Sequence, residues 1–300
     1  MVLLGNDRGA CLGGGMTRLP EPLTLSGRNG HGAVLSYGAH ALSWAPEGHE
    51  PVLWVSSRAY NETGRAIRGG VPLCFPWFGP GRTGDMEPAH GFARITEWTL
   101  AEQGEDEQGD PFAEFALTSE DVAPELREVF PRDFSARFRM TAGRTLRLEL
   151  TVTNTGSETF EVEEALHTYL HVGDSERITV SGLEGASFYD KVAKEQRVQQ
   201  GELRLTGETD AVFAHRGEVR VADPALGREL VIGKEGSDST VVWNPWADKA
   251  VGMSDFADDE WKTMLCVEAG NVMGSPVRLA AGETHTIAQV VEVRELPAEQ

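Results

Sequence analysis

Two histidines and a tyrosine alternate with apolar residues in one short stretch, residues 163–172. If this stretch is a β-strand, His167, Tyr169 and His171 share one face, because successive side chains of a strand point to opposite sides. Its β-branched and aromatic residues favour a strand over a helix. A titratable face of this kind suits proton transfer near neutral pH. A strand with one solvated face explains the same pattern.

Two acidic residues are candidates for the same chemistry. Glu268 lies in a nearly continuous apolar strand, residues 264–269. Burying a carboxylate without a partner is costly, so Glu268 must be paired, hydrogen-bonded or raised in pKa. It suits either a general base or one half of a structural salt bridge. Asp210, at a turn before a predicted strand, suits hydrogen bonds to sugar hydroxyls or a simple turn cap.

Basic residues stand out in a stretch dense in glycine, proline and aromatic residues, 65–80. There Arg68 precedes Gly69–Gly70, and glycines let the backbone approach a ligand while an arginine presents a planar fork to a phosphate. His90 and Arg94, at the two ends of the next compact unit, repeat this combination. Ordinary turns with solvated arginines account for both segments equally well.

Two other kinds of site have weaker support. His167 and His171 have metal-ligand spacing, but the glutamate of an HExxH motif is absent and no third ligand with zinc-like spacing is near. Glu268 and Asp210 are compatible with a glycosidase carboxylate pair, although many proteins contain two such acids. The sequence therefore predicts neither a metal nor another cofactor.

The composition narrows the range of partners and locations. With 27 Lys and Arg against 47 Asp and Glu, the formal net charge is −20, which argues against binding to nucleic acids or anionic membranes. Any phosphate must be held by a local basic cluster. Three cysteines, Cys11, Cys74 and Cys266, form no CxxC motif and indicate neither a disulfide framework nor a zinc ribbon. Without a signal-like or membrane-spanning run, we expect a cytoplasmic protein.

Short strand-like runs separated by turn residues must position these groups. The clearest alternation covers residues 145–153, and one short helix is predicted at Pro124–Phe130, while the acidic segment 101–111 indicates a turn. Further strands are predicted at 33–37, 40–44, 51–56, 95–100, 112–117, 177–180, 203–205, 218–221, 229–232, 240–243, 263–269 and 286–293. The pattern predicts one all-β domain, residues 23–300, built as a large antiparallel β-sandwich with one or two short helices, after a flexible leader, residues 1–22.

Six motifs taken together resemble a known family. They are Arg68-Gly-Gly-Val-Pro with Phe75-Pro-Trp-Phe-Gly79, His90-Gly-Phe-Ala-Arg94, Leu166-His-Thr-Tyr169, Thr240-Val-Val-Trp-Asn-Pro-Trp246, Met253-Ser-Asp-Phe256 and Cys266-Val-Glu-Ala-Gly-Asn271. In this order they resemble the hexose-6-phosphate mutarotases, the glucose-6-phosphate 1-epimerase branch of the aldose 1-epimerase family. The resemblance extends from about residue 23 to residue 293.

The resemblance implies a galactose mutarotase-like supersandwich and an isomerase that interconverts α and β anomers without a cofactor. It assigns catalysis to His167 and Glu268. It assigns phosphate and sugar contacts to Arg68, Arg94 and Asp210, with His90 in the same pocket. The family commonly has glutamine immediately before the His-Gly-Phe-Ala-Arg motif, where this chain has Ala89, so another polar group or water must make that contact.

The expected chemistry requires one base and one acid, on opposite sides of the sugar, because ring opening removes the anomeric hydroxyl proton and protonates the ring oxygen. Glu268 is the predicted base and His167 the predicted acid, with a hexose 6-phosphate, most simply glucose 6-phosphate, as substrate of a monomeric enzyme. Two alternatives stay open: a mutarotase of unphosphorylated aldoses, and a non-catalytic sugar-phosphate-binding sandwich.

Overall fold

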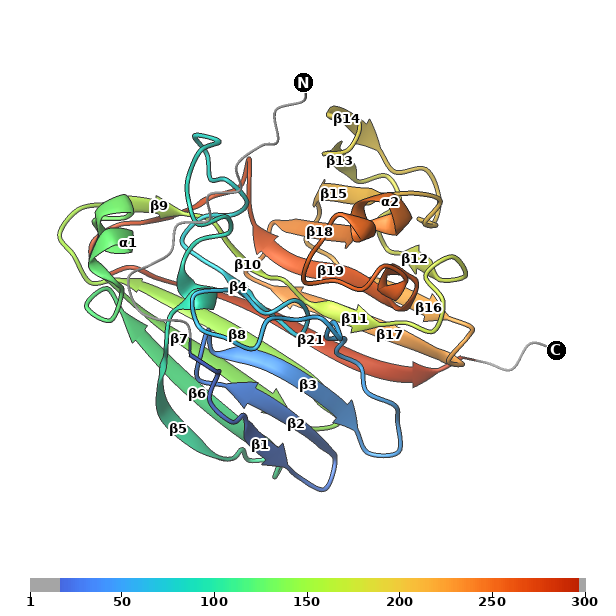
Figure 1. The fold of residues 1–300 in the computed structure, drawn as a ribbon, viewed down its shortest axis with the longest axis horizontal. Coiled ribbons are helices and arrows are strands. Elements are labelled where there is room, and N and C mark those ends of the chain that lie inside the picture. The colour runs from blue at the N-terminus through green and yellow to red at the C-terminus, as the bar shows by residue number, and fades with distance from the viewer. Residues whose placement is uncertain (1–16, 297–300) are drawn as a thin grey trace.

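The computed structural model describes residues 17–296, which form an antiparallel fold whose regular secondary structure is nearly all β-strand (Figure 1). One eight-stranded sheet, here called the scaffold sheet, has the order β12 (Thr179–Ser181), β16 (Val219–Asp223), β17 (Arg228–Glu235), β21 (Thr284–Glu295), β8 (Thr145–Asn154), β7 (Phe134–Ala142), β6 (Pro111–Thr118) and β5 (Thr99–Glu105). The predicted all-β fold class is confirmed.

A second eight-stranded sheet, the site sheet, has the order β14 (Glu195–Val198), β13 (Ser187–Asp190), β15 (Thr209–Ala214), β18 (Ser239–Asn244), β19 (Met264–Asn271), β10 (Glu164–Leu166) and β4 (Leu73–Cys74), with β11 (Tyr169–His171) also paired to β19. A three-stranded sheet contains β1 (Leu23–Ser26), β2 (Gly30–Leu35) and β3 (His40–Pro46), and β9 (Phe160–Val162) pairs with β20 (Val277–Leu279). Two short helices, α1 (Pro124–Val129) and α2 (Trp246–Val251), and two 3₁₀ turns, η1 (Ala93–Ile95) and η2 (Glu260–Thr263), complete the described elements.

The main core lies between the scaffold and site sheets. On β8, Leu146, Leu148 and Leu150 are completely buried, while the residues between them are partly exposed. They belong to the same apolar cluster as Leu170 of β11 and Val267 of β19. Each fully buried leucine contributes about 1.5–3 kcal/mol, so the alternation seen in the sequence holds β19 and its functional side chains against the scaffold.

Three segments differ from the secondary structure predicted for them. The acidic segment is not all turn, because β5 continues to Glu105 before the chain reverses. Residues 51–56 form no regular strand and pair only through isolated bridges, Leu53 with Leu170 and Val55 with Gly69. Residues 203–205 likewise contribute one bridge. These segments lie against strands without a continuous ladder, which apolar alternation alone does not reveal.

The predicted single strand over residues 163–172 is divided into β10 and β11. Both pieces pair with β19 in one unbroken register, Leu166 opposite Ala269 and Tyr169 opposite Cys266. The interruption therefore falls at His167 and Thr168, and the backbone N–H of Thr168 donates to the carbonyl of Leu166, 2.9 Å away. The candidate catalytic histidine therefore lies at a local kink in the chain.

Residues 17–22 of the expected leader are among the described residues. Residues 1–16 of the expected leader lie outside the described residues, but Arg18 forms a β-bridge with Glu62 and Leu19 is buried beside Leu35 and Ile67. No helix among residues 17–296 combines the length and the apolar character that a membrane span would need.

Candidate active site

Glu268 lies in the middle of β19, an interior strand of the site sheet in which every residue is buried. It pairs with Val241 of β18 on one side. Because side chains alternate along a strand, Cys266 and Glu268 project from the same face. The Glu268 side chain is only 1% exposed, as the apolar sequence around it predicts.

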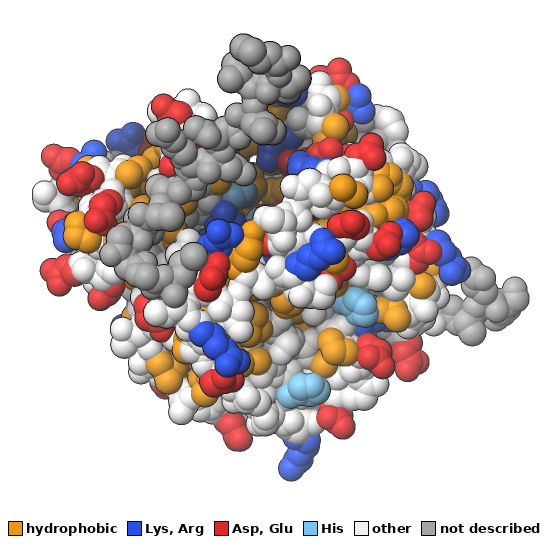
Figure 2. All heavy atoms as spheres, in the orientation of Figure 1, with side chains coloured by type: hydrophobic (Ala, Val, Ile, Leu, Met, Phe, Trp, Pro, Cys, Tyr) orange, Lys and Arg blue, Asp and Glu red, His pale blue; other side chains and the backbone are white. Residues whose placement is uncertain are grey.

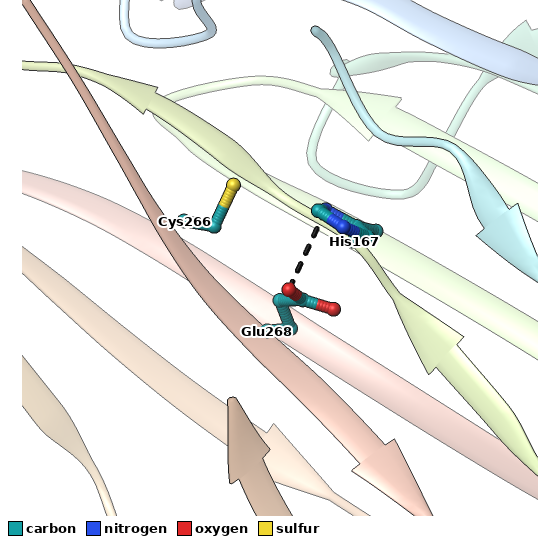
Figure 3. Close-up of side chains that lie close together, drawn as sticks. All are labelled: His167, Cys266 and Glu268. Atoms are coloured by element: carbon teal, nitrogen blue, oxygen red, sulfur yellow. Dashed lines mark ion pairs between the residues drawn. The ribbon is translucent and has the colours of Figure 1, made fainter. Parts of the chain in front are cut away.

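His167 lies at the kink between β10 and β11 and faces Glu268 on the neighbouring strand β19. Its Nδ1 lies 3.5 Å from Oε1 of Glu268, and a dashed line marks this pair in Figure 3. The ring of Tyr169 stacks on the imidazole, with centroids 4.8 Å apart and planes at 11°, and Trp243 meets it edge-on. The two predicted catalytic side chains are thus brought into direct contact, whereas His171 points elsewhere, with its Nδ1 3.4 Å from the carbonyl of Pro51.

Arg68 reaches the same place from the loop before β4. Its Nη1 donates to the hydroxyl of Tyr169 at 3.0 Å, and its Nε donates to Oδ2 of Asp255 at 3.1 Å. Asp255, which follows α2, was not singled out in the sequence as a ligand of this arginine. The guanidinium is therefore oriented by two partners and remains partly exposed, with 27% of its side chain accessible.

The two glycines after Arg68 serve the fold rather than a ligand. Gly69 and Gly70 have φ angles of 120° and 58°, which side chains disfavour, and a Cβ on Gly69 would lie 2.4 Å from the Cα of Val55. A Cβ on Gly70 would lie 2.2 Å from the carbonyl oxygen of Ala41. The sequence-based interpretation that these glycines let the backbone approach a ligand is not what their neighbours indicate.

His90 and Arg94 are held beside the pair by η1 and the loop before it. The His90 ring lies 5.7 Å from the His167 ring, and its Nδ1 lies 3.3 Å from Sγ of Cys74. Arg94 donates through Nη2 to the carbonyl of Ala89 at 2.6 Å. Residue 89 therefore orients the arginine through its backbone, whatever its side chain.

Asp210 forms the opposite side of this group, but it does not act alone. It is the second residue of β15, opposite Trp243 of β18, and its Oδ2 lies 3.1 Å from Nζ of Lys191. Lys191 comes from the β13–β14 hairpin, and its ammonium group lies over the ring of Phe78 at 5.5 Å. Sequence reasoning missed Lys191, because nothing in the polar hairpin indicates which lysine turns inward.

Burial and neighbouring charges shift the proton affinities at the centre. Removal from water raises the pKa of Glu268 well above its ordinary value, and the negative charge of Asp210 adds to this effect. Burial also lowers the pKa of His167 well below its ordinary value, with the positive charges of Arg94 and Arg68 acting in the same direction. Perturbed pairs of this kind are typical of proton-transfer sites.

Basic groups thus converge on the centre of an acidic chain: Arg68, Arg94 and Lys191 all act electrostatically on His167. On the face drawn in Figure 2, acidic and basic side chains are interspersed, and Lys or Arg side chains lie at the edge of a hollow in its upper half. A buried donor–acceptor pair bordered by three cations can transfer protons at one end of a bound anion.

Comparisons with known proteins identify relatives along nearly the whole chain. Residues 22–292 match the model of the family described as "Aldose 1-epimerase". A protein of Escherichia coli named "Putative glucose-6-phosphate 1-epimerase" is 41% identical over 77% of this chain and 76% of its own. A plant protein of the same name, from Cenchrus ciliaris, is 36% identical over 88% and 82%.

Two solved structures superpose on this chain over most of its length. The crystal structure of a mutarotase described as putative, YeaD from Salmonella typhimurium, superposes with a TM-score of 0.83 at 33% identity, covering 91% of this chain and 90% of that one. A galactose mutarotase-like protein from Lactobacillus casei gives a TM-score of 0.71 at 15% identity, over 91% and 100%. The second likeness concerns the fold alone, and both confirm the predicted galactose mutarotase-like architecture.

Proposed function

The chain belongs to the aldose 1-epimerase family, and we propose that it interconverts the α and β anomers of a hexose 6-phosphate, with glucose 6-phosphate as its main substrate. The observation that carries this proposal is the buried contact between His167 and Glu268, 3.5 Å apart, among three basic side chains. The family assignment supplies the reaction class. The relatives named for glucose 6-phosphate support the phosphorylated substrate.

Anomer exchange requires only proton transfers and the breaking and re-forming of one C–O bond. The base removes the proton from the hydroxyl on C1 while the acid protonates the ring oxygen, and the bond between C1 and the ring oxygen breaks to give the open-chain aldehyde. Rotation about C1–C2 and closure on the other face give the second anomer. We assign the base to Glu268 and the acid to His167, each worth about 10²–10⁴-fold in rate.

The contact between the two residues leads us to propose a different geometry from the one expected from the sequence. The sequence-based prediction put the acid and the base on opposite sides of the sugar, but with 3.5 Å between Nδ1 and Oε1 no sugar ring fits between those atoms. The anomeric hydroxyl oxygen and the ring oxygen are both bonded to C1. A base and an acid that lie side by side can therefore reach both oxygens from one edge of the ring.

One proton shared by the pair is sufficient for the cycle. Burial favours the neutral arrangement, with the proton on Glu268 and an uncharged imidazole. The charges of Lys191 and Arg94 pull in the other direction at Glu268, toward the carboxylate that a base needs. Ring opening moves the pair from one arrangement to the other, and ring closure returns it.

We assign the 6-phosphate to Arg68 and Arg94, with Lys191 as a third cation and Asp210 and His90 contacting the sugar. Arg68 is already oriented by Asp255 and Tyr169, so little side-chain entropy is lost when an anion binds. Because the phosphate is remote from C1, these arginines act mainly on substrate binding. The expectations of a monomer and of a cytoplasmic location remain predictions.

The test is exchange NMR on the purified protein with glucose 6-phosphate, galactose 6-phosphate and free glucose. We expect transfer between the anomeric C1–H signals to be fastest for glucose 6-phosphate and slow for glucose. Equal exchange of glucose and glucose 6-phosphate would favour a mutarotase of unphosphorylated aldoses. Binding of sugar phosphate without any exchange would favour a non-catalytic module and overturn the proposal.

A further inference from the structure

The catalytic pair has a third neighbour that anomer exchange does not use. Cys266 lies two residues before Glu268 on the same face of β19, and it is opposite Tyr169 of the paired strand β11. One ligand atom each from His167, Cys266 and Glu268 lies within 4.8 Å of the other two, and all three residues are buried. Figure 3 shows the thiol, the imidazole and the carboxyl group arranged around one common space.

Two atoms of this cluster lack the partners that buried polar groups normally have. Nδ1 of His167 and Oε2 of Glu268 are inaccessible and form no hydrogen bond with any group among residues 17–296. An unpaired buried polar atom is unfavourable, because it has lost its hydrogen bonds to water and has gained none in the protein. Both atoms belong to side chains that project into the space shared with Sγ of Cys266.

We propose that His167, Cys266 and Glu268 form a binding site for Zn²⁺, and that occupation of this site inhibits the enzyme. Nitrogen, thiolate sulfur and carboxylate oxygen are the ligands of protein-bound zinc, and three protein ligands with an open fourth position are a common arrangement. Bond lengths of 2.0–2.3 Å require ligand atoms roughly 3.3–3.7 Å apart in a tetrahedron. The 3.5 Å between Nδ1 and Oε1 already matches one edge, and the remaining edges, at most 4.8 Å, must shorten by side-chain rotation when the metal binds.

The proton and charge balance suits a buried site. Zinc displaces one proton from the Cys266 thiol and, in the neutral form of the pair, one from the Glu268 carboxyl group, and both protons leave to solvent. The cation with one thiolate, one carboxylate and one neutral imidazole carries no net charge. Repulsion from Arg68, Arg94 and Lys191 is therefore offset within the site, and Asp210, whose charge acts on the same carboxyl group, adds a favourable negative charge.

Inhibition follows because the metal occupies the two atoms that transfer protons. Nδ1 of His167 and the carboxylate of Glu268 cannot both coordinate zinc and serve the sugar. This consequence rests on the proposed function, whereas the existence of the site does not. Binding of the metal alone must therefore be measured separately from activity.

The binding experiment uses Co²⁺ as a spectroscopic probe and Zn²⁺ titration calorimetry, both without phosphate or sugar. We expect one equivalent of metal, with a thiolate-to-Co²⁺ charge-transfer band. In Cys266→Ser this band should disappear and the zinc affinity should fall about 100-fold, since even outer-shell partners are worth 10–100-fold. Cys74→Ser is the matched control, because Cys74 is equally buried but contacts His90 instead.

A Cys11→Ser variant serves as the control for the remaining thiol. If serine is not tolerated at position 266, Cys266→Ala replaces it. A thermal melt of each variant shows whether it folds. Anomer exchange in Cys266→Ser should match the unaltered protein in the absence of zinc and should lose its sensitivity to zinc. Unchanged zinc affinity in Cys266→Ser, loss of the band in Cys74→Ser, or no metal binding at all would overturn the site. Metal binding that is lost with Cys266 in a protein without anomer exchange would refute only the proposed function.

Discussion

Gln289 provides a sharp test of how the scaffold positions the catalytic pair. It lies on β21 of the scaffold sheet and is completely buried. Its Nε2 donates to the carbonyl of Val267 at 2.9 Å, and its Oε1 accepts a hydrogen bond from the hydroxyl of Thr168. Val267 precedes Glu268, and Thr168 follows His167. One side chain therefore joins the two chain segments that carry the proposed base and the proposed acid.

Gln289→Leu should weaken both stability and catalysis. Each buried hydrogen bond contributes about 1 kcal/mol, and a buried polar group left unpaired costs about 1–3 kcal/mol. The hydroxyl of Thr168 keeps a longer bond to the carbonyl of Leu166, 3.3 Å away, so the loss falls mainly at Val267. We expect a loss of about 2–4 kcal/mol in the free energy of unfolding, and up to about 100-fold in kcat because small displacements of a catalytic group are costly.

The assay combines urea unfolding with exchange NMR on glucose 6-phosphate. Thr286→Val on the same strand is the matched control. The Thr286 hydroxyl also bonds to a neighbouring strand, but at an exposed position, where water replaces the lost partner and less than about 0.5 kcal/mol should be lost. A Gln289→Leu protein with unchanged stability and kcat would refute the idea that this contact aligns the pair, and equal losses in both variants would show that burial is not the reason.

Three further predictions concern the reaction itself. His167→Asn and Glu268→Gln should each reduce exchange by at least about 100-fold with the thermal melt retained; full exchange in either, followed by NMR, would contradict the assignment. Arg68→Ala should raise the KM for glucose 6-phosphate about 10- to 100-fold, as the loss of a charge-assisted hydrogen bond of about 1.5–3 kcal/mol implies, while Arg65→Ala, an exposed arginine paired with Glu62, should not; a kcat effect alone would argue against phosphate binding. The kcat profile should stay level as pH falls through about 6.5, the ordinary pKa of an imidazole. The lowered pKa of His167 means that the pair takes up a second proton only at lower pH, and the raised pKa of Glu268 moves the alkaline loss of activity to higher pH. A loss of activity on the acid side centred at about pH 6.5 would contradict these shifts.

The sequence by itself determined the fold class and the types of residue at the site. Alternation over residues 145–153 predicted β8, and Pro124 marked the beginning of α1, because these signals lie within a single element. Six motifs in order were sufficient to indicate the family that the comparisons confirm. A carboxylate in an apolar run already implied that Glu268 is buried and perturbed, because a strand that is apolar on both faces belongs in the interior of a fold.

Only the tertiary structure decided which groups meet. The register of β10 and β11 against β19 brings His167 beside Glu268, and no local pattern specifies the residue across a strand pair. The partners of two predicted site residues, Asp255 for Arg68 and Lys191 for Asp210, likewise come from other loops. Alternation determines which face of a strand is buried, but pairing over a hundred residues along the chain determines which atoms on that face come close enough to exchange a proton.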